Sequence, residues 1–384
     1  MGETSRRKFF LAGLALPAAA RMAAAPEPAV PLRFRMLGKT GLRVTELGCG
    51  CEAVSDPTVL RHAADLGINF FDTARAYEGG NNERVLKTVL EGRRKNLIVA
   101  SRSYATDART VREHLDTSLK EIGTDYLDIW YFGNKNAPEE VNDEMLAVQL
   151  AAQKAGKIRF RGISTHRLHR MVQFIIENRF DVVQIPYNFV IGTRRDPQRM
   201  EATGLEDALT ELKRAGIGVV AMKVMAGRWH GRPEDNPLYP VYRQESGRAA
   251  AIRWVLRDDR VQTTSVRMVD REQVDENIRA MSGPFSAEDE KILSARLEQI
   301  KPLYCRECGA CDGACPKGLP VSDIVRYVMY AEGYNCFEMG YNRFQSLPAN
   351  LRAVRCSDCA ACAVDCPNGV RVQQRLARAQ QLFA

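Results

Sequence analysis

Eight of the 11 cysteines in the chain repeat one spacing near its C-terminus, and thiolates at such spacings bind metal. The run Cys305-x-x-Cys308-x-x-Cys311-x-x-x-Cys315-Pro316 recurs as Cys356-x-x-Cys359-x-x-Cys362-x-x-x-Cys366-Pro367. Three close thiolates can hold three corners of a [4Fe–4S] cube, while the fourth is carried away by the next helix and reaches the other cube. We therefore predict two [4Fe–4S] clusters. One would be held by Cys305, Cys308, Cys311 and Cys366, and the other by Cys356, Cys359, Cys362 and Cys315.

Two other uses of clustered cysteines are weighed against iron. Four-cysteine zinc sites usually consist of paired C-x-x-C knuckles, without this three-plus-one spacing and its trailing proline. A disulfide framework stabilises small secreted domains, and a chain of 384 residues has no need of one. The spacing is that of bacterial two-cluster ferredoxins, so we predict a small ferredoxin-like domain over residues 301–384.

This C-terminal domain is predicted to be mainly helical. Val321–Tyr334 and Val370–Phe383 both show the apolar spacing of helices. Cys336 lies outside the two cysteine motifs and is interpreted as a buried thiol.

The middle of the chain alternates short β-type runs with amphipathic helical runs, which predicts a parallel (β/α)8 TIM barrel over residues 31–300. The predicted strands are Val44–Gly48, Ile68–Asp72, Leu97–Ser101, Leu127–Phe132, Ile158–Ser164, Val182–Pro186, Gly218–Lys223 and Thr263–Val266. An open doubly wound sheet would have a Gly-rich first turn, and no G-x-G-x-x-G occurs. The active site of a barrel lies at the C-terminal ends of its strands. Cys49 and Cys51 would face that site, as packing residues rather than ligands.

Several short motifs occur in the order in which aldo–keto reductases carry them. They are Arg35–Val44, Phe71–Tyr77 with Asn82 and Glu83, Asp125–Asp128, Gly162–His166, Gln184–Asn188 and Glu276–Asn277. Over about residues 33–300 the chain resembles this family, and its cysteines make it similar to the branch with a ferredoxin-like tail. The resemblance implies an oxidoreductase that interconverts a carbonyl and an alcohol, with NADP(H) as the hydride carrier.

The family carries a catalytic tetrad of Tyr, Lys, Asp and His, and the resemblance implies Asp72 and Tyr77 for two of these roles. Arg102 stands where the Lys is expected. It can pair with Asp72 and supply positive charge to Tyr77, although its planar guanidinium is bulkier than an ammonium. Gly133 stands where the His is expected. His166 is the candidate to project into the space that Gly133 leaves. Asn134 and Lys135 are further candidates in the same loop, and a histidine hydrogen-bonded at the barrel rim is the commoner alternative.

The resemblance also implies dinucleotide contacts. Ser164 and Gln184 match residues that contact the nicotinamide amide, and Glu276 and Asn277 match the pair at the adenine end. Arg271 or Arg267 could bind a 2′-phosphate, and Arg267 could equally block the site, because the family usually has a Gly there.

The N-terminus has the features of a twin-arginine export signal within residues 1–30. Arg6 and Arg7 precede an apolar stretch of about 12 residues, which is too short to span a bilayer, and an Ala-rich run follows. This predicts recognition by the twin-arginine export machinery and a periplasmic location, with no stable membrane span. A disordered tail with adjacent arginines is the alternative.

The composition is that of a soluble globular protein, and the net charge of +8 gives little support to nucleic-acid binding. Three functions remain open. In the first, a carbonyl or alcohol substrate reacts in the barrel, and the clusters exchange electrons with a partner protein. In the second, the barrel is a catalytically degenerate scaffold or docking surface of an electron-transfer protein, with Asp72 and Arg102 as a structural ion pair. In the third, the clusters only fasten the C-terminal segment to the barrel.

Overall fold

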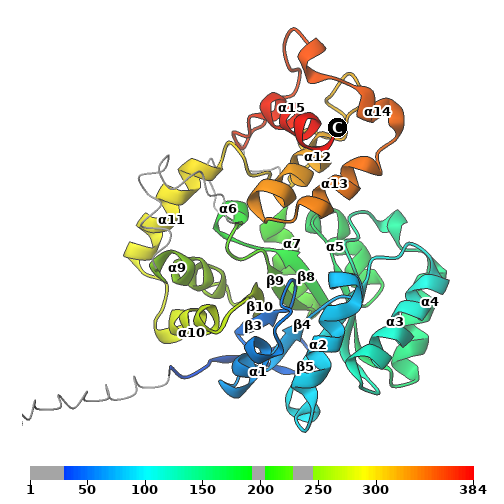
Figure 1. Ribbon diagram of the computed structural model, residues 1–384, viewed down its shortest axis with the longest axis vertical. Coiled ribbons are helices and arrows are strands. Elements are labelled where there is room, and N and C mark those ends of the chain that lie inside the picture. Colours follow the sequence, from blue (N-terminus) through cyan, green and yellow to red (C-terminus); the bar gives the residue numbers. More distant parts are fainter. Residues whose placement is uncertain (1–29, 193–203, 228–244) are drawn as a thin grey trace, which may run out of the picture.

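The computed structural model describes residues 30–192, 204–227 and 245–384, and its largest part is a closed barrel of eight parallel strands (Figure 1). The strands are β3 (Leu47–Gly50), β4 (Phe70–Asp72), β5 (Ile98–Ser103), β6 (Leu127–Phe132), β7 (Ile158–Ser164), β8 (Val182–Pro186), β9 (Gly218–Met222) and β10 (Thr263–Arg267). They follow one another around the barrel in sequence order, and β10 closes against β3. The predicted (β/α)8 barrel is therefore confirmed. The predicted export signal lies outside the described residues.

The first predicted strand, Val44–Gly48, is wrong as one element. The chain first forms an antiparallel hairpin of β1 (Phe34–Met36) and β2 (Arg43–Thr45), and the barrel strand begins only at Leu47. Between them, the buried carboxylate of Glu46 accepts hydrogen bonds from Arg33 and Arg35, each at 2.8 Å. These two ion pairs fix the corner at which the chain turns from the hairpin into the barrel.

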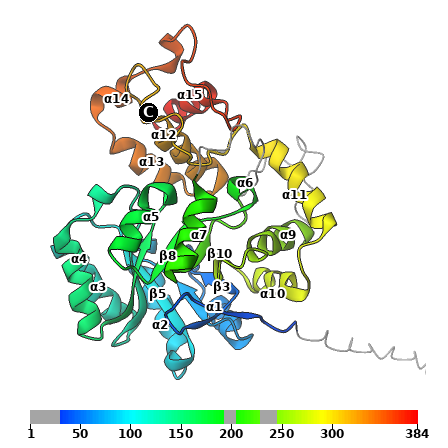
Figure 2. The same cartoon turned by 180° about the vertical axis from the view of Figure 1, so that it is seen from behind.

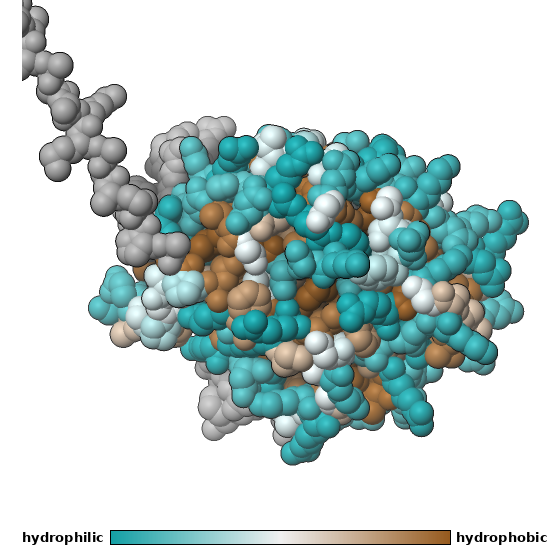
Figure 3. Space-filling model, turned by 90° about the horizontal axis from the view of Figure 1, so that it is seen from below, coloured by the Kyte–Doolittle hydropathy of each residue, from teal (hydrophilic) through white to brown (hydrophobic). Residues whose placement is uncertain are grey.

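The hairpin closes the lower end of the barrel. Leu37, Leu42 and Val44 join the apolar side chains that fill the barrel interior, among them Phe70 and Ile129. Seen from below, this end of the molecule is largely hydrophilic, with smaller hydrophobic areas between the polar residues (Figure 3). The lower end is therefore packed, which leaves the upper end for a site.

Helices surround the barrel on its outer side (Figures 1 and 2). They are α1 (Pro57–Asp65), α2 (Asn81–Leu90), α3 (Ala108–Ile122), α4 (Asp143–Lys154), α5 (Leu168–Glu177), α6 (Phe189–Gly192), α7 (Leu205–Ala215), α9 (Glu245–Leu256), α10 (Arg271–Arg279) and α11 (Ala287–Ile300). Local signals fix their ends. Asp107 caps the start of α3 by accepting from the Thr110 backbone N–H, and Gly123 ends it in the left-handed region.

The C-terminal residues form a second, mainly helical unit on top of the barrel (Figures 1 and 2). Its elements are α12 (Val321–Val328), the π-helical turn η7 (Met329–Gly333), α13 (Phe337–Gln345), α14 (Ala349–Ala353) and α15 (Val372–Phe383). The two predicted helical segments correspond to α12 with η7 and to α15. No helix of the described residues is long and apolar enough to cross a membrane. We call this unit the cluster domain.

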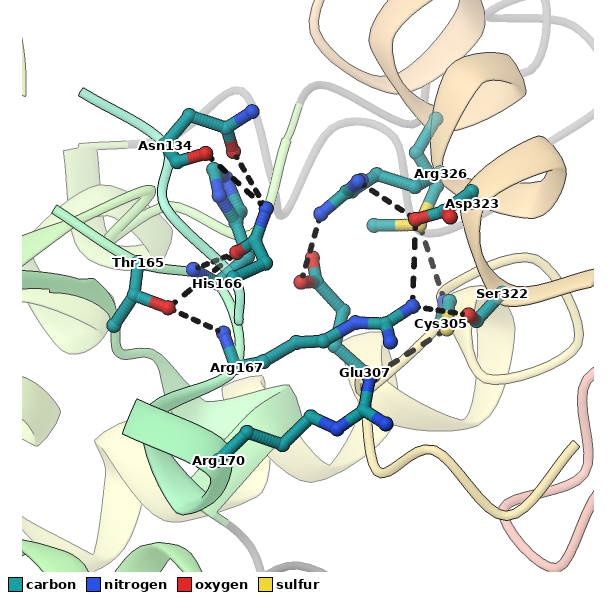
Figure 4. Close-up of polar contacts among 12 residues, drawn as sticks. Asn134, Thr165, His166, Arg167, Arg170, Cys305, Glu307, Ser322, Asp323 and Arg326 are labelled. Atoms are coloured by element: carbon teal, nitrogen blue, oxygen red, sulfur yellow. Dashed lines mark hydrogen bonds and ion pairs between the residues drawn. The ribbon is translucent and has the colours of Figure 1, made fainter. Parts of the chain in front are cut away.

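A polar network joins the cluster domain to the rim of the barrel (Figure 4). Arg167, just after β7, donates to Asp312 at 3.0 Å and to the Ser322 hydroxyl at 2.7 Å. Within the cluster domain, Arg326 bonds Asp323 at 2.8 Å and Glu307 at 3.4 Å. Arg167 and Arg326 are both buried. Buried charges need fixed partners, so this network holds the cluster domain in one position over the C-terminal ends of the strands.

Candidate active site and cluster sites

A cavity of about 700 Å³ lies between the C-terminal ends of the barrel strands and the cluster domain. Asp72, Tyr77 and Arg102 line it from the barrel. Tyr334, which follows η7, and Arg343 of α13 line it from the cluster domain. The predicted catalytic residues therefore face a space that the cluster domain roofs, and we take this cavity as the candidate active site.

The floor of the cavity is a buried ion pair. Arg102 Nη2 bonds the Asp72 carboxylate, and Arg102 Nε donates to the Thr73 carbonyl at 3.2 Å. Both charged side chains are at most 4% exposed. Burial alone would lower the pKa of Arg102, but attraction to Asp72 raises it well above its ordinary value, so the guanidinium stays charged. Arg102 thus takes the place predicted for it beside Asp72.

Gln184 and Ser265 complete this floor. The Gln184 amide donates to Asp72 Oδ2 at 2.8 Å and accepts from Arg102 Nη1. The Ser265 hydroxyl donates to the same Asp72 oxygen at 2.8 Å. Gln184 was predicted to contact a nicotinamide amide. Both ends of its own amide are already engaged, which leaves one N–H and one lone pair for a ligand.

Tyr77 lies directly above the floor, at the start of the short helical turn η1 (Tyr77–Gly80). Burial, followed by repulsion from Tyr104, raises the pKa of Tyr77 well above its ordinary value, and Arg102 opposes the rise. The phenol therefore keeps its proton at neutral pH and can donate it to a ligand in the cavity.

Tyr104 fills the space beside Gly133, and the prediction that His166 projects into it is wrong. A Cβ atom built on Gly133 would lie 2.7 Å from a ring carbon of Tyr104. Burial raises the pKa of Tyr104, while Arg102 and a hydrogen bond with Tyr77 lower it. A second phenol thus stands where the tetrad has its histidine. The signal for it was its place just beyond the end of β5.

His166 lines the cavity at the barrel rim, as the alternative reading expected. With the Asn134 amide oriented to satisfy its neighbours, it donates to His166 Nδ1 at 2.8 Å. The imidazole proton then lies on Nε2, which has no hydrogen-bond partner among the described residues. Burial, followed by repulsion from Lys223, Arg326, Arg343 and Arg102, lowers the pKa of His166 well below its ordinary value. His166 is therefore a neutral hydrogen-bond donor.

Lys223 and Arg343 were not among the predicted site residues. Lys223 follows β9, and its ammonium lies 4.5 Å from the ring centre of Tyr330 and 5.0 Å from that of Tyr334. Its position at the end of a barrel strand was a signal for a site residue. Arg343 had no such signal, because the sequence does not show that α13 covers the barrel.

The cysteines outside the cluster motifs differ from their predictions. Cys336 is half-buried, lines the cavity and lies beside Arg267, so it is not a fully buried thiol. Cys49 and Cys51 do not face the cavity. Side chains alternate along a strand, and Cys49 of β3 and Cys51 just after it both lie in the apolar layer beneath the helices, fully buried.

The predicted dinucleotide residues fall into two groups. Ser164 lines the cavity with Gln184, and its hydroxyl accepts from the Asn134 backbone N–H at 2.8 Å, so its own proton stays free for a ligand. Arg271, Glu276 and Asn277 lie on α10 and do not line the cavity.

Glu276 and Asn277 are the residues on α10 that were predicted to contact an adenine. Glu276 forms an ion pair with Arg248. Asn277 is buried, and its Oδ1 has no partner in the part of the chain that the structure describes. A buried acceptor without a donor fits an amine such as that of adenine, so the residues present are compatible with a dinucleotide.

The eight motif cysteines gather as the spacing predicts. Burial, followed by repulsion from Asp312, Cys308 and Cys366, raises the pKa of Cys311 to about 11. Cys366 belongs to the second motif, so its closeness to Cys311 places it with the first three thiols. Asn368 donates to Cys308 Sγ at 3.3 Å, which is the kind of hydrogen bond that cluster thiolates accept.

The second set gathers around a small cavity. The four cysteines predicted for it, Cys315, Cys356, Cys359 and Cys362, all line this cavity together with small residues such as Ala361 and Ala363. No group of three or more potential ligands within the described ranges is close enough to hold a single metal ion. The two sets of four thiols, with small residues beside them and an amide donor to Cys308, fit two iron–sulfur clusters.

Comparisons with known proteins divide the chain at the same place. Residues 52–298 match the sequence profile of the aldo/keto reductase family, and residues 304–371 match that of a 4Fe-4S dicluster domain. The L-glyceraldehyde 3-phosphate reductase of Escherichia coli O157:H7 is 26% identical over 327 residues, which cover 69% of this chain and 92% of that protein.

Two further proteins extend the comparison. The L-galactose dehydrogenase of Arabidopsis thaliana is 28% identical over 316 residues, covering 71% of this chain and 96% of that protein. Among solved structures, the holo form of aldo-keto reductase AKR11C1 from Bacillus halodurans superimposes with a TM-score of 0.58 at 24% identity. It covers 70% of this chain and 96% of that one, a likeness that concerns the fold alone.

Proposed function

The chain belongs to the aldo/keto reductase family of oxidoreductases, and we propose that it interconverts a carbonyl and an alcohol in the cavity beneath its cluster domain. The position of Tyr77 carries this proposal. The Tyr77 side chain lines the cavity beside the buried Asp72–Arg102 pair and keeps its proton at neutral pH. A phenol in such a place can protonate the oxygen of a carbonyl as it becomes an alkoxide.

Tyr77 is the acid–base residue of the proposed reaction. In reduction, the Tyr77 O–H bond breaks and its proton goes to the substrate oxygen, while the equivalent of a hydride reaches the carbonyl carbon. In oxidation, both transfers run in reverse. Arg102 stabilises the negative charge left on Tyr77, and Asp72 fixes Arg102 in place. Tyr104 is the second hydroxyl for orienting the substrate oxygen.

The electrons have two proposed sources. When bound, a nicotinamide dinucleotide supplies or takes the hydride, and the two clusters pass electrons singly to or from a partner protein. A hydride equals two electrons and one proton, so one electron from each cluster and one proton from solvent, besides the proton that Tyr77 gives to the substrate oxygen, balance one turnover. The residues that would hold the dinucleotide are Ser164, Gln184, Glu276 and Asn277, with Arg271 as the candidate for a 2′-phosphate.

We also propose export to the periplasm, because the paired arginines and the apolar stretch at the N-terminus suit the twin-arginine route. That route carries folded proteins, as a chain with pre-inserted clusters requires. NADP(H) has no evident supply outside the cytoplasm, so a dinucleotide would be recycled in place through the clusters. Fractionation of cells producing the full chain, with Arg6 and Arg7 changed to Lys as the control, tests this proposal.

Calorimetric titration of NADPH, with NADH beside it, into the anaerobic protein with both clusters intact tests the proposed chemistry. Saturable binding supports a dinucleotide-dependent reaction, and Asn277→Ala should then weaken it. The first substrates to try are L-glyceraldehyde 3-phosphate and L-galactose, the compounds in the names of the two relatives. An absence of binding at millimolar NADPH and NADH would remove hydride transfer from a dinucleotide and leave the clusters as the electron source.

One observation favours a second candidate function. The floor of the cavity satisfies its own hydrogen-bonding groups, as expected of a structural ion pair in an electron-transfer protein with a degenerate barrel. Under that function, Tyr77→Phe would leave every redox property unchanged. Loss of substrate turnover in that variant, with cluster reduction by dithionite intact, decides for the enzyme.

A further inference from the structure

One side of the active-site cavity carries two buried hydrogen-bond donors without acceptors, and a guanidinium without a carboxylate partner lies beside one of them. Lys223 Nζ is buried and finds no hydrogen-bond acceptor among the described residues. It lies over the rings of Tyr330 and Tyr334 and attracts the buried Glu307 carboxylate without a hydrogen bond. His166 Nε2 is likewise buried and without a partner there. Unpaired buried donors cost free energy, so a site that keeps two of them side by side is suited to a ligand that supplies acceptors.

Arg343 of α13 is the third donor. Its two terminal nitrogens both point at one oxygen, Asn134 Oδ1, at 3.0 and 3.1 Å. It forms no ion pair with a carboxylate in the part of the chain that the structure describes, although it is half-buried. Asn134 holds Arg343 through its oxygen and His166 through its nitrogen, so one amide places both groups on the same side of the cavity. We call Lys223, His166 and Arg343 the basic wall.

The carboxylates near the basic wall are already engaged. Asp72 is paired with Arg102 on the floor, and Glu307 is bonded by Arg326 across from His166 (Figure 4). The other acidic residues that line the cavity are Glu52, Glu78 and Glu338. Glu52 acts on Tyr77 and Tyr104, and the remaining two are exposed.

The approach to the basic wall is also positively charged. A second cavity of about 320 Å³ shares Tyr104, Asn134 and Arg343 with the first. Its charged lining residues are Lys135, Arg167, Arg170, Arg326 and Arg343 against Glu140 and Asp323. An excess of cations in the adjoining cavity raises the local concentration of anions beside the basic wall.

From this arrangement we infer that the substrate carries an oxyanion, a carboxylate or a phosphate, which binds between Lys223, His166 Nε2 and Arg343 while its carbonyl or hydroxyl group faces Tyr77. An oxyanion has acceptors and no donors, so it satisfies all three groups of the wall, whereas a hydroxyl or an amide would bring donors of its own. The inference rests on the proposed function for the reacting end of the substrate. The cluster domain, through Arg343, then takes part in substrate recognition.

The phosphates of a dinucleotide are the other oxyanions to consider. The predicted adenine end lies on α10, which follows β10. Lys223 follows β9, which lies between β8 and β10 in the barrel, and its ammonium lies over the rings of Tyr330 and Tyr334. The other two groups of the wall are held together by Asn134, with Arg343 coming from the cluster domain. The basic wall is therefore assigned to the substrate, and the experiment below separates the two sources.

The test measures binding rather than turnover, so it can fail separately from the proposed function. Pyruvate, its uncharged analogue pyruvamide, inorganic phosphate and NADPH are titrated calorimetrically into the anaerobic full chain with both clusters intact. Pyruvate should bind more tightly than pyruvamide, and Lys223→Met and Arg343→Gln should each weaken pyruvate roughly 10- to 100-fold, as expected for lost hydrogen bonds between charged groups. Phosphate should be weakened in parallel if the wall accepts either oxyanion.

Matched controls separate a local effect from a general one. Lys213→Met and Arg109→Gln remove the same side chains from exposed surface ion pairs and should leave every affinity unchanged. Lys223→Arg should keep most of the pyruvate affinity, and Tyr77→Phe should keep it while abolishing turnover. Equal binding of pyruvate and pyruvamide, binding of neither pyruvate nor phosphate, or weakening of NADPH instead of pyruvate in Lys223→Met would each overturn the inference.

Discussion

The floor of the cavity and its basic wall face the same space and treat their polar groups differently. On the floor, Asp72 accepts from Arg102, Gln184 and Ser265, and Arg102 donates to three separate oxygens. On the basic wall, Lys223 Nζ and His166 Nε2 have no hydrogen-bond partner among the described residues. A satisfied set of charges holds its geometry, whereas an unsatisfied set is suited to receive a ligand. Proton transfer and recognition of the substrate therefore use separate groups in this site.

The largest difference should appear when one charge is removed from each region. Arg102→Met leaves the Asp72 carboxylate buried without its partner, so we expect a loss of about 3–5 kcal/mol in unfolding free energy. Lys223→Met removes a charge that has no hydrogen-bonded carboxylate partner among the described residues, and we expect a change below about 1 kcal/mol. Urea unfolding followed by tryptophan fluorescence measures both, since the three tryptophans lie within residues 31–300. Equal losses would break the distinction between floor and wall.

Tyr104 offers the next test, because it belongs to the floor side without being part of the ion pair. Tyr104→Phe removes one hydroxyl beside Tyr77 and should lower turnover roughly 10- to 100-fold, with the affinity for pyruvate unchanged. Gly133→His alone should lose turnover, because its Cβ would lie 2.7 Å from a ring carbon of Tyr104. The double variant Gly133→His with Tyr104→Ala should recover part of the lost rate. If it recovers nothing, Tyr104 does not take the role of the missing histidine.

The sequence predicted the elements that build this site better than the individual side chains that line it. The barrel strands and the grouping of the cluster cysteines follow from periodicity and spacing, which are local properties. The Asp72–Arg102 pair was predicted from the resemblance to aldo–keto reductases. The place of Tyr104 just beyond β5 marked it as a candidate, but which side chain fills the space beside Gly133 depends on packing across the barrel, so Tyr104 could not be chosen over His166 from the sequence. Arg343 could not be predicted either, because its role depends on the docking of α13 over a barrel that precedes it by many residues.

The basic wall should also show in the pH dependence of stability. The pKa of His166 is lowered in the folded protein, so the unfolded chain binds its proton more readily. The folded state is therefore penalised as the pH falls below the ordinary histidine value of about 6.5, with a slope approaching about 1.4 kcal/mol per pH unit. His166→Gln should remove this contribution, and His62→Gln, at a surface ion pair, should not. Unfolding curves between pH 5 and pH 8 measure the difference, and identical slopes in the wild type and His166→Gln would contradict it.

The smallest expected effect is the pH response of carbonyl reduction itself. The pKa of Tyr77 is raised above its ordinary value, so the phenol stays protonated, and thus able to donate, throughout the neutral range. The reduction rate should be nearly constant between pH 6 and pH 9, whereas alcohol oxidation, which must place a proton on Tyr77, should rise with pH. A reduction rate that falls through pH 7 would assign the proton donor to another group.

The measurement that tests the central claim most directly is turnover of the best carbonyl substrate by Tyr77→Phe, with electrons from NADPH or from dithionite-reduced clusters. The exposed Tyr341 of α13 does not line the cavity, so Tyr341→Phe is the matched control. We predict that Tyr77→Phe loses roughly 10²- to 10⁴-fold in rate with both electron sources, while Tyr341→Phe keeps the wild-type rate. Wild-type turnover in Tyr77→Phe would contradict the assignment of Tyr77 and of this cavity as the place where the carbonyl reacts.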